Sequence, residues 1–510
     1  MRLHICGKCS IFAADLNAKT TMKKIFLSIF SLLILAGASG MRASDVGVPS
    51  ESEDVMLQAF YWNSYDQYKS TTKYNYTKWV QLLKDTAAIN ANFDLVWLPP
   101  SAKSNGGVGY YHTCRSNQDS DWGTKANLTK LITALHAGKT KVIADIVINH
   151  RGDISGWTTF SSDNFGDYGK FDLNQSHICA GDEAFTNSSS PQYGSSNHGG
   201  NDTGTNDPGA RDMDHASTFV QNWAKAYTQW MINVMNYDGF RYDMTRGYAG
   251  KYLKMYNETA KPYLSVSEFW TGIDEMVTHL QATEYNTMVF DFPLKGVLHD
   301  AIVKSSYGKL KKNSYTMRGK GLEKYAVTFI DNHDTFERPE EDACNQEFGG
   351  CRANLDDADV KNWILQANAY ILMMPGVPCV FWPHWYKYRE EINEMIAIRK
   401  LAGIHSESKV SAESGNSSSK AYSGTIAGHR ANVILRLGPK RSTEVPEGYR
   451  LALEGGDRGD YTIFISDGSQ SVAEVKDEGL KVKGEKFMQD GKLFIRVNEN
   501  IYDITGKKIQ

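Results

Sequence analysis

One short apolar run decides the fold: Val142-Ile143-Ala144-Asp145-Ile146-Val147-Ile148. Its length and its β-branched residues predict a buried strand. Amphipathic helical patterns flank this strand along the chain, at Leu128 to His136 before it and at Phe219 to Asn236 after it. A buried strand between helices is typical of a parallel sheet that helices cover.

The same alternation of strand and helix extends outward over residues 44–402. Seven further runs predict strands, at residues 55–61, 95–98, 239–242, 264–267, 288–290, 325–330 and 377–381. Further helical patterns lie at residues 78–91, 360–373 and 391–401. About eight strand–helix units over this length predict an α/β fold, a catalytic (β/α)8 TIM barrel.

The alternation stops at residues 151–214, which are rich in Gly, Ser, Asn and Asp. A loop this long inside a compact domain is usually functional, so we expect an inserted, loop-rich domain B after the third strand. Beyond the barrel, short alternating runs at 421–426, 433–437 and 461–465 predict a C-terminal antiparallel β domain over residues 403–475. The tail, residues 476–510, contains an expected strand pair but has no predicted role.

The first 43 residues read as a leader. Met22-Lys23-Lys24 precede an apolar run from Ile25 to Leu35, and small residues follow at 36–40. This pattern predicts a signal peptide that starts at Met22. The run is too short to anchor the chain across a bilayer, and no other stretch is long enough. We therefore expect a secreted or periplasmic protein without a transmembrane anchor.

Composition and charge narrow the class of partner. The net charge of −3 offers no field that would hold nucleic acid or an anionic membrane. Aromatic residues make up 12% of the chain, which suits stacking on sugar rings and suits an aromatic core equally well. Cysteines are too sparse for a disulfide scaffold, although Cys344 and Cys351 could bridge or stay free. We expect a monomer.

Three of the predicted strands end in an acid. Asp243 follows the fourth strand, Glu268 follows the fifth, and Asp334 lies just after the seventh. Catalytic groups of a TIM barrel lie where its strands end. A single Asp at such a position is more often the cap of the next helix. Three acids at barrel strand ends favour a catalytic site.

Four blocks carry a resemblance to a known family. They are Asp145 to His150, Gly239 to Asp243, Ser267 to Trp270 and Asp331 to Thr335, in this order. The chain resembles the α-amylase family, glycoside hydrolase family 13, over roughly residues 50–475. The four motifs are specific as a set. The stretch Trp97-Leu98-Pro99-Pro100 looks most like plant-type α-amylases and their bacterial relatives.

The resemblance implies a role for each acid. Asp243 would be the nucleophile, which forms a covalent glycosyl-enzyme and gives retention of configuration. Glu268 would be the general acid and then the base, with a pKa raised by neighbouring acids and partial burial. Asp334 would bind sugar hydroxyls and help to distort the ring. The implied substrate is a starch-like α-glucan or malto-oligosaccharide, cut internally at α-1,4 bonds.

The resemblance also implies substrate contacts. Tyr110 would stack on a sugar, and His150 and His333 would donate hydrogen bonds to substrate hydroxyls. Arg241 and Trp270 complete this set, and Arg241 would also hold Asp243 ionised from two residues away on the same strand. The alternative for each histidine is a satisfied residue of the core.

A structural Ca²⁺ between the barrel and domain B is implied as well. Ca²⁺ prefers six to eight hard oxygen ligands. Asn149, Asp202 and Asp212 match the family's side-chain ligands, and the carbonyl of Gly247 would complete the set. The alternative is that these residues are only turn formers.

Other functions remain open at this stage. The same catalytic set serves oligosaccharide α-glucosidases and transglycosylases, and loops decide among them. A non-catalytic glycan-binding protein could keep the barrel, although all three acids are present. Arg246-Gly247 stands where many relatives carry Lys-His, which agrees with the plant-type subgroup.

Overall fold

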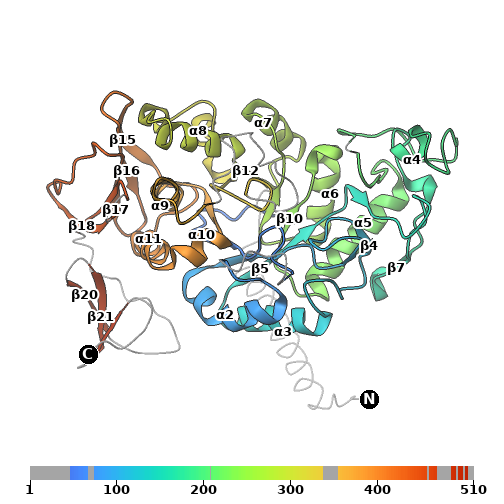
Figure 1. The fold of residues 1–510 in the computed structure, drawn as a ribbon, viewed down its shortest axis with the longest axis horizontal. Helices are drawn as coiled ribbons and strands as arrows, with labels where there is room; N and C mark the ends of the chain where they lie inside the picture. The colour runs from blue at the N-terminus through green and yellow to red at the C-terminus, as the bar shows by residue number, and fades with distance from the viewer. Residues whose placement is uncertain are drawn as a thin grey trace, which may run out of the picture. The chain divides into compact units, whose positions relative to one another are not determined.

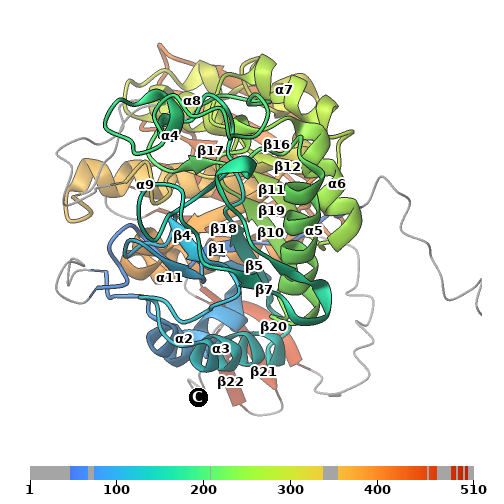
Figure 2. The same cartoon turned by 90° about the vertical axis from the view of Figure 1, so that its right-hand side faces the viewer.

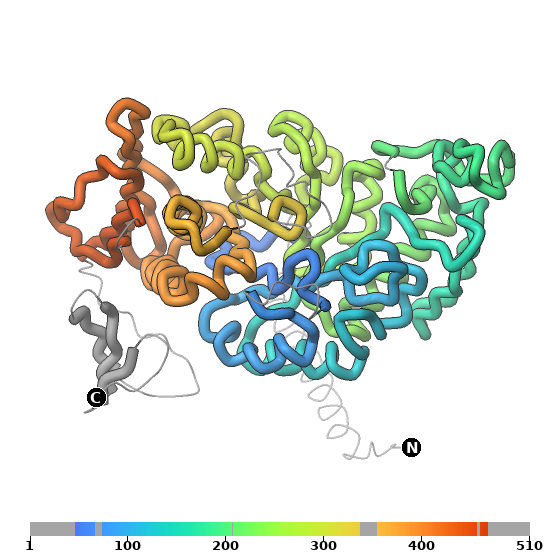
Figure 3. Tube along the Cα trace, viewed as in Figure 1, coloured from blue at the N-terminus to red at the C-terminus, as the bar shows by residue number. Residues whose placement is uncertain are grey.

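The computed structural model describes residues 46–66, 74–206, 208–336, 354–455 and 459–467, together with the backbone of three later strands. Figure 1 draws the helices and strands, and Figure 3 traces the chain through these ranges. The leader, the tail beyond residue 503 and the pair Cys344 and Cys351 lie outside the described residues. The predictions made for them are therefore untested.

Eight parallel strands close into a barrel, in the order β1-β14-β13-β12-β11-β10-β5-β2. The TIM barrel prediction is confirmed. The strands are β1 (Met56–Gln58), β2 (Leu95–Trp97), β5 (Lys141–Ile146), β10 (Gly239–Tyr242), β11 (Ser265–Ser267), β12 (Met288–Phe290), β13 (Ala326–Thr328) and β14 (Val377–Phe381). Each run that predicted a strand overlaps one of them.

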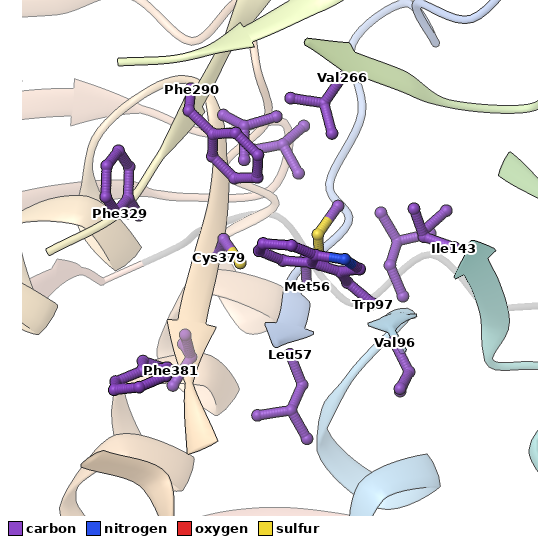
Figure 4. Close-up of a cluster of buried hydrophobic side chains, with 14 of the residues drawn as sticks. Met56, Leu57, Val96, Trp97, Ile143, Val266, Phe290, Phe329, Cys379 and Phe381 are labelled. Carbon is purple, nitrogen blue, oxygen red and sulfur yellow. The ribbon is translucent and has the colours of Figure 1, made fainter. Parts of the chain in front are cut away.

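Large apolar side chains fill the barrel. Trp97 is fully buried and packs edge-on against Phe60, with 5.2 Å between the ring centroids. Phe290 lies 5.4 Å from the same indole. Figure 4 shows Trp97 among side chains from several strands, including Met56 and Cys379. The interior is thus a packed core, so the chemistry has to lie at a rim of the barrel.

Helices cover the strands from outside. They are α2 (Trp79–Asn92), α3 (Lys125–Ala137), α5 (Thr218–Asn233), α6 (Gly250–Ala260), α7 (Ile273–Ala282), α8 (Phe292–Ile302), α9 (Ala358–Met373), α10 (Trp382–Lys387) and α11 (Arg389–Ala402). Helices α5 and α6 run side by side in Figure 2. The sequence predicted α2, α3, α5, α9 and α11 and missed the others, which are short. In the described residues, no helix has the length and apolar character to cross a membrane.

Short ladders organise the segment that follows the third barrel strand. Strand β6 (His150–Arg151) pairs antiparallel with β9 (Arg211–Asp212), which returns the chain to the barrel. Two buried ion pairs hold the loops between them: Arg151 with Asp163 at 2.5 Å, and Arg211 with Asp182 at 2.6 Å. Paired buried charges of this kind specify a loop that has little apolar core.

A five-stranded antiparallel sheet follows the barrel, in the order β15-β16-β17-β19-β18. It confirms the predicted C-terminal β structure. Its strands are β15 (Val410–Asn416), β16 (Ala421–Ala427), β17 (Asn432–Leu437), β18 (Tyr449–Glu454) and β19 (Tyr461–Ser466). The later segment forms three strands and not the expected pair: β20 (Gly484–Gln489), β21 (Lys492–Val497) and β22 (Asn500–Asp503).

Candidate active site

Two acids lie at the carboxyl ends of neighbouring barrel strands. Asp243 directly follows β10, and Glu268 directly follows β11. Because β10 and β11 are parallel and paired, with Tyr242 opposite Ser267, the two acids emerge at the same rim. Strand β10 also pairs with β5, where Arg241 lies opposite Asp145. The register therefore gathers several charged side chains around one point.

Arg241 is the centre of this group. Its Nη1 lies 2.8 Å from Asp145 Oδ1 and 2.7 Å from Asp243 Oδ1, and its Nη2 lies 2.9 Å from Glu268 Oε2. Its side chain is only 1% exposed. Arg241 therefore contacts three carboxyl groups and is almost inaccessible to a sugar. The structure places it as a support of the acids more than as the substrate contact that was expected.

One positive charge cannot neutralise three buried carboxylates. Burial raises the pKa of Glu268 to about 8, Arg241 opposes the rise, and Asp243 and Asp334 add to it. Burial raises the pKa of Asp243 to about 7 and that of Asp145 to about 6, again against the pull of Arg241. All three carboxyl groups therefore hold their protons to higher pH than a solvent-exposed carboxyl group does. A raised pKa at Glu268 fits a general acid at that position.

The backbone after Asp243 turns toward Glu268. Met244 has a φ of 44°, in the left-handed region that non-glycine residues rarely occupy. Its N–H donates to Glu268 Oε2 at 2.8 Å. Thr245 donates from its hydroxyl to the Glu268 carbonyl at 2.7 Å. The turn after one acid therefore holds the side chain and the backbone of the other.

Asp334 approaches the same rim from the loop after β13. Its Oδ2 lies 3.2 Å from His333 Nε2. The side-chain oxygen of Asn332 accepts from the backbone N–H groups of Asp334 and Thr335, each at 2.9 Å, which shapes the loop. The negative charge of Asp334 raises the pKa of both Asp243 and Glu268, so the three acids share one electrostatic environment.

A chain of hydrogen bonds runs under the rim. Gln58 Nε2 lies 3.0 Å from His333 Nδ1, His333 Nε2 lies 2.6 Å from Tyr110 Oη, and Tyr110 Oη donates to Asp145 Oδ2 at 3.0 Å. Since the Gln58 amide donates, His333 carries its proton on Nε2. Trp97 Nε1 donates to the same Asp145 oxygen at 3.1 Å. Asp145, the last member of this series of hydrogen bonds, also forms an ion pair with Arg241.

Three rings lie parallel beside this chain. Tyr110 and His333 have centroids 5.3 Å apart with planes 9° apart, and the half-buried Trp62 stacks on both. Tyr110 is itself buried. Trp62, which was not predicted, therefore extends the aromatic stack that Tyr110 and His333 form.

His150 lies at the end of the strand segment that enters the inserted loops. Its Nε2 lies 2.9 Å from the carbonyl oxygen of Tyr110, which can only accept, so Nε2 carries the proton. Burial lowers the pKa of His150 to about 4, so the ring is neutral. Only Nδ1, an acceptor, remains for a ligand. As placed, His150 can accept a hydrogen bond from a substrate hydroxyl, whereas donation was predicted.

Trp270 belongs to the packing around the rim. Its indole stacks on Phe292 with 4.7 Å between centroids, and Arg246 Nη1 donates to its carbonyl at 2.9 Å. The Trp270 side chain is only half-buried, so part of it is accessible to solvent.

The four residues expected to hold Ca²⁺ come together. Asn149 Nδ2 donates to Asp212 Oδ1 at 3.3 Å, and a Cβ on Gly247 would lie 1.9 Å from Asn149 Oδ1. The turn at Asp202 and Gly204 lies against the backbone of residues 246–248. Within the described residues, Asp202 Oδ2 is buried and has no hydrogen-bond partner. An all-oxygen set with an unsatisfied carboxylate oxygen fits a hard cation.

Sequence reasoning missed four residues of this site: Gln58, Trp62, Trp97 and Asp145. Asp145 and Trp97 stood inside quoted motifs but received no role. A charged residue in an otherwise apolar buried strand was a usable signal for Asp145, because such a charge needs a partner. Nothing local marks Gln58, which lies 275 residues from the histidine it contacts.

Comparisons with known proteins agree with this geometry. Residues 88–383 match a family model described as "Alpha amylase, catalytic domain". The chain is 30% identical over 397 residues to "Probable alpha-amylase 2" of Arabidopsis thaliana, covering 72% of this chain and 85% of that protein. It is 28% identical over 432 residues to "Alpha-amylase 3, chloroplastic" of the same plant, covering 79% of this chain. It spans only 43% of the length of that second relative.

Solved structures show the same fold. An Anoxybacillus α-amylase superimposes with a TM-score of 0.59 and 15% sequence identity, over 82% of this chain and 99% of that one. An α-amylase from Geobacillus thermoleovorans gives 0.56 at 15% identity, over 81% and 98%.

Proposed function

The chain belongs to the α-amylase family of glycoside hydrolases, and on that premise we propose that it hydrolyses α-1,4-glucosidic bonds inside starch-like α-glucans with retention of configuration. One observation carries the proposal. A single buried guanidinium, that of Arg241, contacts both Asp243 and Glu268 at the ends of adjacent strands. This brings two carboxyl groups to one place with unequal proton affinities, as a retaining glycosidase requires.

In the first step, Asp243 attacks the anomeric carbon and forms a covalent glycosyl-enzyme. Arg241 favours the ionised nucleophile, because its Nη1 lies 2.7 Å from the Asp243 carboxylate. The second Asp243 oxygen is buried and has no hydrogen-bond partner in the described residues. No protein donor in the described residues therefore competes for that oxygen.

Glu268 supplies the proton that the leaving glycosidic oxygen takes up. It then removes a proton from the water that hydrolyses the intermediate, so it ends the cycle protonated. Burial raises its pKa to about 8, which keeps the proton available near neutral pH. The Met244 N–H holds its Oε2 at 2.8 Å and leaves the other oxygen for the substrate.

Asp334 would bind hydroxyls of the sugar at the cleavage point. Its position beside His333 fits this role, since the histidine fixes one carboxylate oxygen at 3.2 Å. Tyr110 and Trp62 would give that sugar an aromatic surface. His150 would accept a hydrogen bond through Nδ1.

The shared contact of the two carboxyl groups with Arg241 supports retention. Retaining enzymes place them about 5–5.5 Å apart, whereas inverting enzymes leave about 6.5–9.5 Å for a water. Two carboxylates held by the two nitrogens of one guanidinium, at 2.7 Å and 2.9 Å, suit the shorter class.

We also propose that Asn149, Asp202, Asp212 and Gly247 hold a Ca²⁺. When bound, the ion would supply a positive charge that ties the inserted loops to the barrel. The residues themselves already join these parts, because Asp212 lies in β9 and Asn149 follows β5. The ion would therefore stabilise the wall of the site without taking part in bond cleavage.

The remaining expectations stand as proposals. The catalytic barrel would span residues 44–402, with domain B at 151–214, and the C-terminal β domain would span 403–475. A signal peptide within residues 1–43 would direct the protein to a secreted or periplasmic location. The enzyme would be a monomer that binds α-glucan and does not bind nucleic acid.

The test is an action-pattern assay on amylose and defined malto-oligosaccharides. Internal cleavage predicts that iodine staining falls much faster than reducing ends appear, and the first product should keep the α configuration by proton NMR. Release of glucose alone from chain ends would reject endo action, and a β product would reject retention.

Matched variants separate the catalytic claim from stability. Asp243→Asn should abolish starch clearing, whereas Asp274→Asn, an 85% exposed aspartate in the first turn of α7, should clear like wild type. Clearing by Asp243→Asn would reject the assigned nucleophile.

A further inference from the structure

Two histidines and two glutamates gather at a place far from the acids in the sequence. Glu51 and Glu53 precede β1, His405 follows α11, and His429 lies in the turn between β16 and β17. One ligand atom from each of Glu51, His405 and His429 lies within 4.8 Å of the others. Three separate segments thus bring metal-binding atoms to one point, and neither the proposed reaction nor the proposed Ca²⁺ site uses them.

The two imidazole rings stack, with centroids 4.1 Å apart and planes 16° apart. His405 is buried at 7% exposure, whereas the side chain of His429 is 41% exposed. One ring therefore forms a fixed wall, and the other lies over it at the edge of solvent. The buried ring is a rigid ligand. The exposed ring has to tilt away from the stack for the in-plane lone pairs of both rings to meet at one ion.

Glu53 sets the orientation of the exposed ring. Its Oε1 accepts from His429 Nδ1 at 3.2 Å. This bond places the proton on Nδ1 and leaves Nε2 as a free lone pair. A carboxylate that orients a histidine through its other nitrogen is the usual outer support of a metal ligand. Arg430 also binds Glu53, with Nη1 at 3.0 Å from Oε1, and keeps that carboxylate in place.

The free lone pair faces a second carboxylate. His429 Nε2 lies 3.8 Å from Glu51 Oε2, too far for a hydrogen bond. Two ligands of one tetrahedral Zn²⁺, each about 2.0–2.2 Å from the metal, lie roughly 3.4 Å apart. The observed gap is therefore close to the spacing that a shared ion would impose.

We propose that Glu51, His405 and His429 form a binding site for a divalent transition-metal ion of the zinc class. Two imidazoles and a carboxylate select such an ion over Ca²⁺, which prefers oxygen alone. Three protein ligands leave one position for water. Metal binding breaks one long hydrogen bond, the 3.3 Å contact from the Glu407 N–H to His405 Nδ1. This bond is lost if Nδ1 binds the metal, and also if Nε2 binds it, because the ring proton then moves to Nδ1.

The ion would act as a structural clamp. It would join the segment before β1, the loop after α11 and the turn of the C-terminal sheet. An ion pair already crosses the same place, since Arg430 Nη2 lies 2.5 Å from Glu53 Oε2. The metal would strengthen that connection and leave the carboxylates at the barrel rim untouched.

Cobalt provides a direct readout. Full-length protein without a polyhistidine tag, saturated with Ca²⁺, is titrated with Co²⁺ and followed by its visible d–d absorption and by Tm. We expect one saturable site with the intense bands of low coordination, competition by Zn²⁺ and a rise in Tm. His429→Ala and Glu51→Gln should abolish that site, and Glu53→Gln should weaken it about 10- to 100-fold.

Controls make the result decisive. His136→Asn removes a histidine that contacts a single carboxylate, Asp238, at 2.8 Å, and it should keep the full Co²⁺ response. Each Tm shift is taken with and without metal for the same variant, so a change in basal stability does not enter. A response that survives in His429→Ala would overturn the proposal, as would the absence of saturable binding.

Discussion

Arg241 Nη2 lies 2.9 Å from Glu268 Oε2, although Arg241 lies in β10, Glu268 follows β11 and helix α6 separates them along the chain. The same side chain contacts Asp243 at 2.7 Å through its other nitrogen. The planar guanidinium is thus shared by the two acids that we assign to catalysis. Its geometry and its charge lead to separate predictions.

Arg241→Lys keeps the charge and removes the planar fork. A lysine ammonium is a compact point charge and cannot hold both acids in the same way. We expect kcat to fall by about 100-fold, the scale of losing one preorganised electrostatic contact, with a smaller change in KM. Steady-state kinetics on a malto-oligosaccharide measure this, and a wild-type kcat in the lysine variant would contradict the assigned support.

The pH dependence of activity follows from the two raised pKa values. Asp243 has to be ionised, and burial raises its pKa to about 7, so activity should rise as pH rises toward that value. Glu268 has to be protonated, and its pKa of about 8 predicts that activity falls as pH rises past it. The profile of kcat/KM should be a narrow bell, and Glu268→Gln should lose its alkaline limb with an activated substrate. An alkaline limb that persists in Glu268→Gln would assign it to another group.

Stability should change with pH in a defined direction. Glu268 has a higher pKa in the folded protein than its ordinary value of 4.5, because burial penalises the charge. The folded state therefore binds more protons than the unfolded state, and this group lowers stability progressively as pH rises from about 4.5 to about 8. Glu268→Gln should melt above wild type at pH 8 by a margin that shrinks toward pH 5. Calorimetry at both pH values measures the margin, and a larger gain at pH 5 would contradict the sign.

Tyr110→Phe isolates the hydroxyl that lies between His333 and Asp145. The substitution keeps the ring and removes one hydrogen-bond partner from each of the buried side chains His333 and Asp145. The free energy of unfolding should fall by about 1–3 kcal/mol. We expect a lower Tm and a reduced kcat/KM. Tyr111→Phe is the matched control, because Tyr111 is its neighbour and is 45% exposed. Equal effects in both variants would argue against the hydrogen-bonded chain.

Removal of Ca²⁺ tests the oxygen-rich site. A chelator should lower the Tm, and Asp202→Asn should reduce the difference between Tm with and without Ca²⁺. The asparagine can still accept from Gly204 N–H, so the loop turn is kept while the charge is lost. Asp172→Asn, on an exposed aspartate of the same inserted segment, should keep the wild-type difference. An unchanged Tm in chelator would count against the site.

Much of the barrel follows from local pattern. A parallel strand buried on both faces is often a continuous apolar run, as in residues 142–148 and 377–381, and each of the eight predicted runs corresponds to a barrel strand. Helices α6, α7, α8 and α10 were not assigned from the sequence, although α6 and α7 each bury one apolar face. Pro293, in the first turn of α8, was a usable signal for the start of that helix.

In the active site, too, some features follow from the local sequence and others only from the tertiary structure. The sequence alone placed Asp243 and Glu268 at strand ends, because the position of an acid after an apolar run is a local property. Only the tertiary structure decided that Arg241 contacts both acids, since that depends on the register of β10 with β5 and with β11. It alone decided that His150 offers an acceptor, and that Glu51, His405 and His429 meet. Contacts between residues hundreds of positions apart are made by packing, and no local pattern records them.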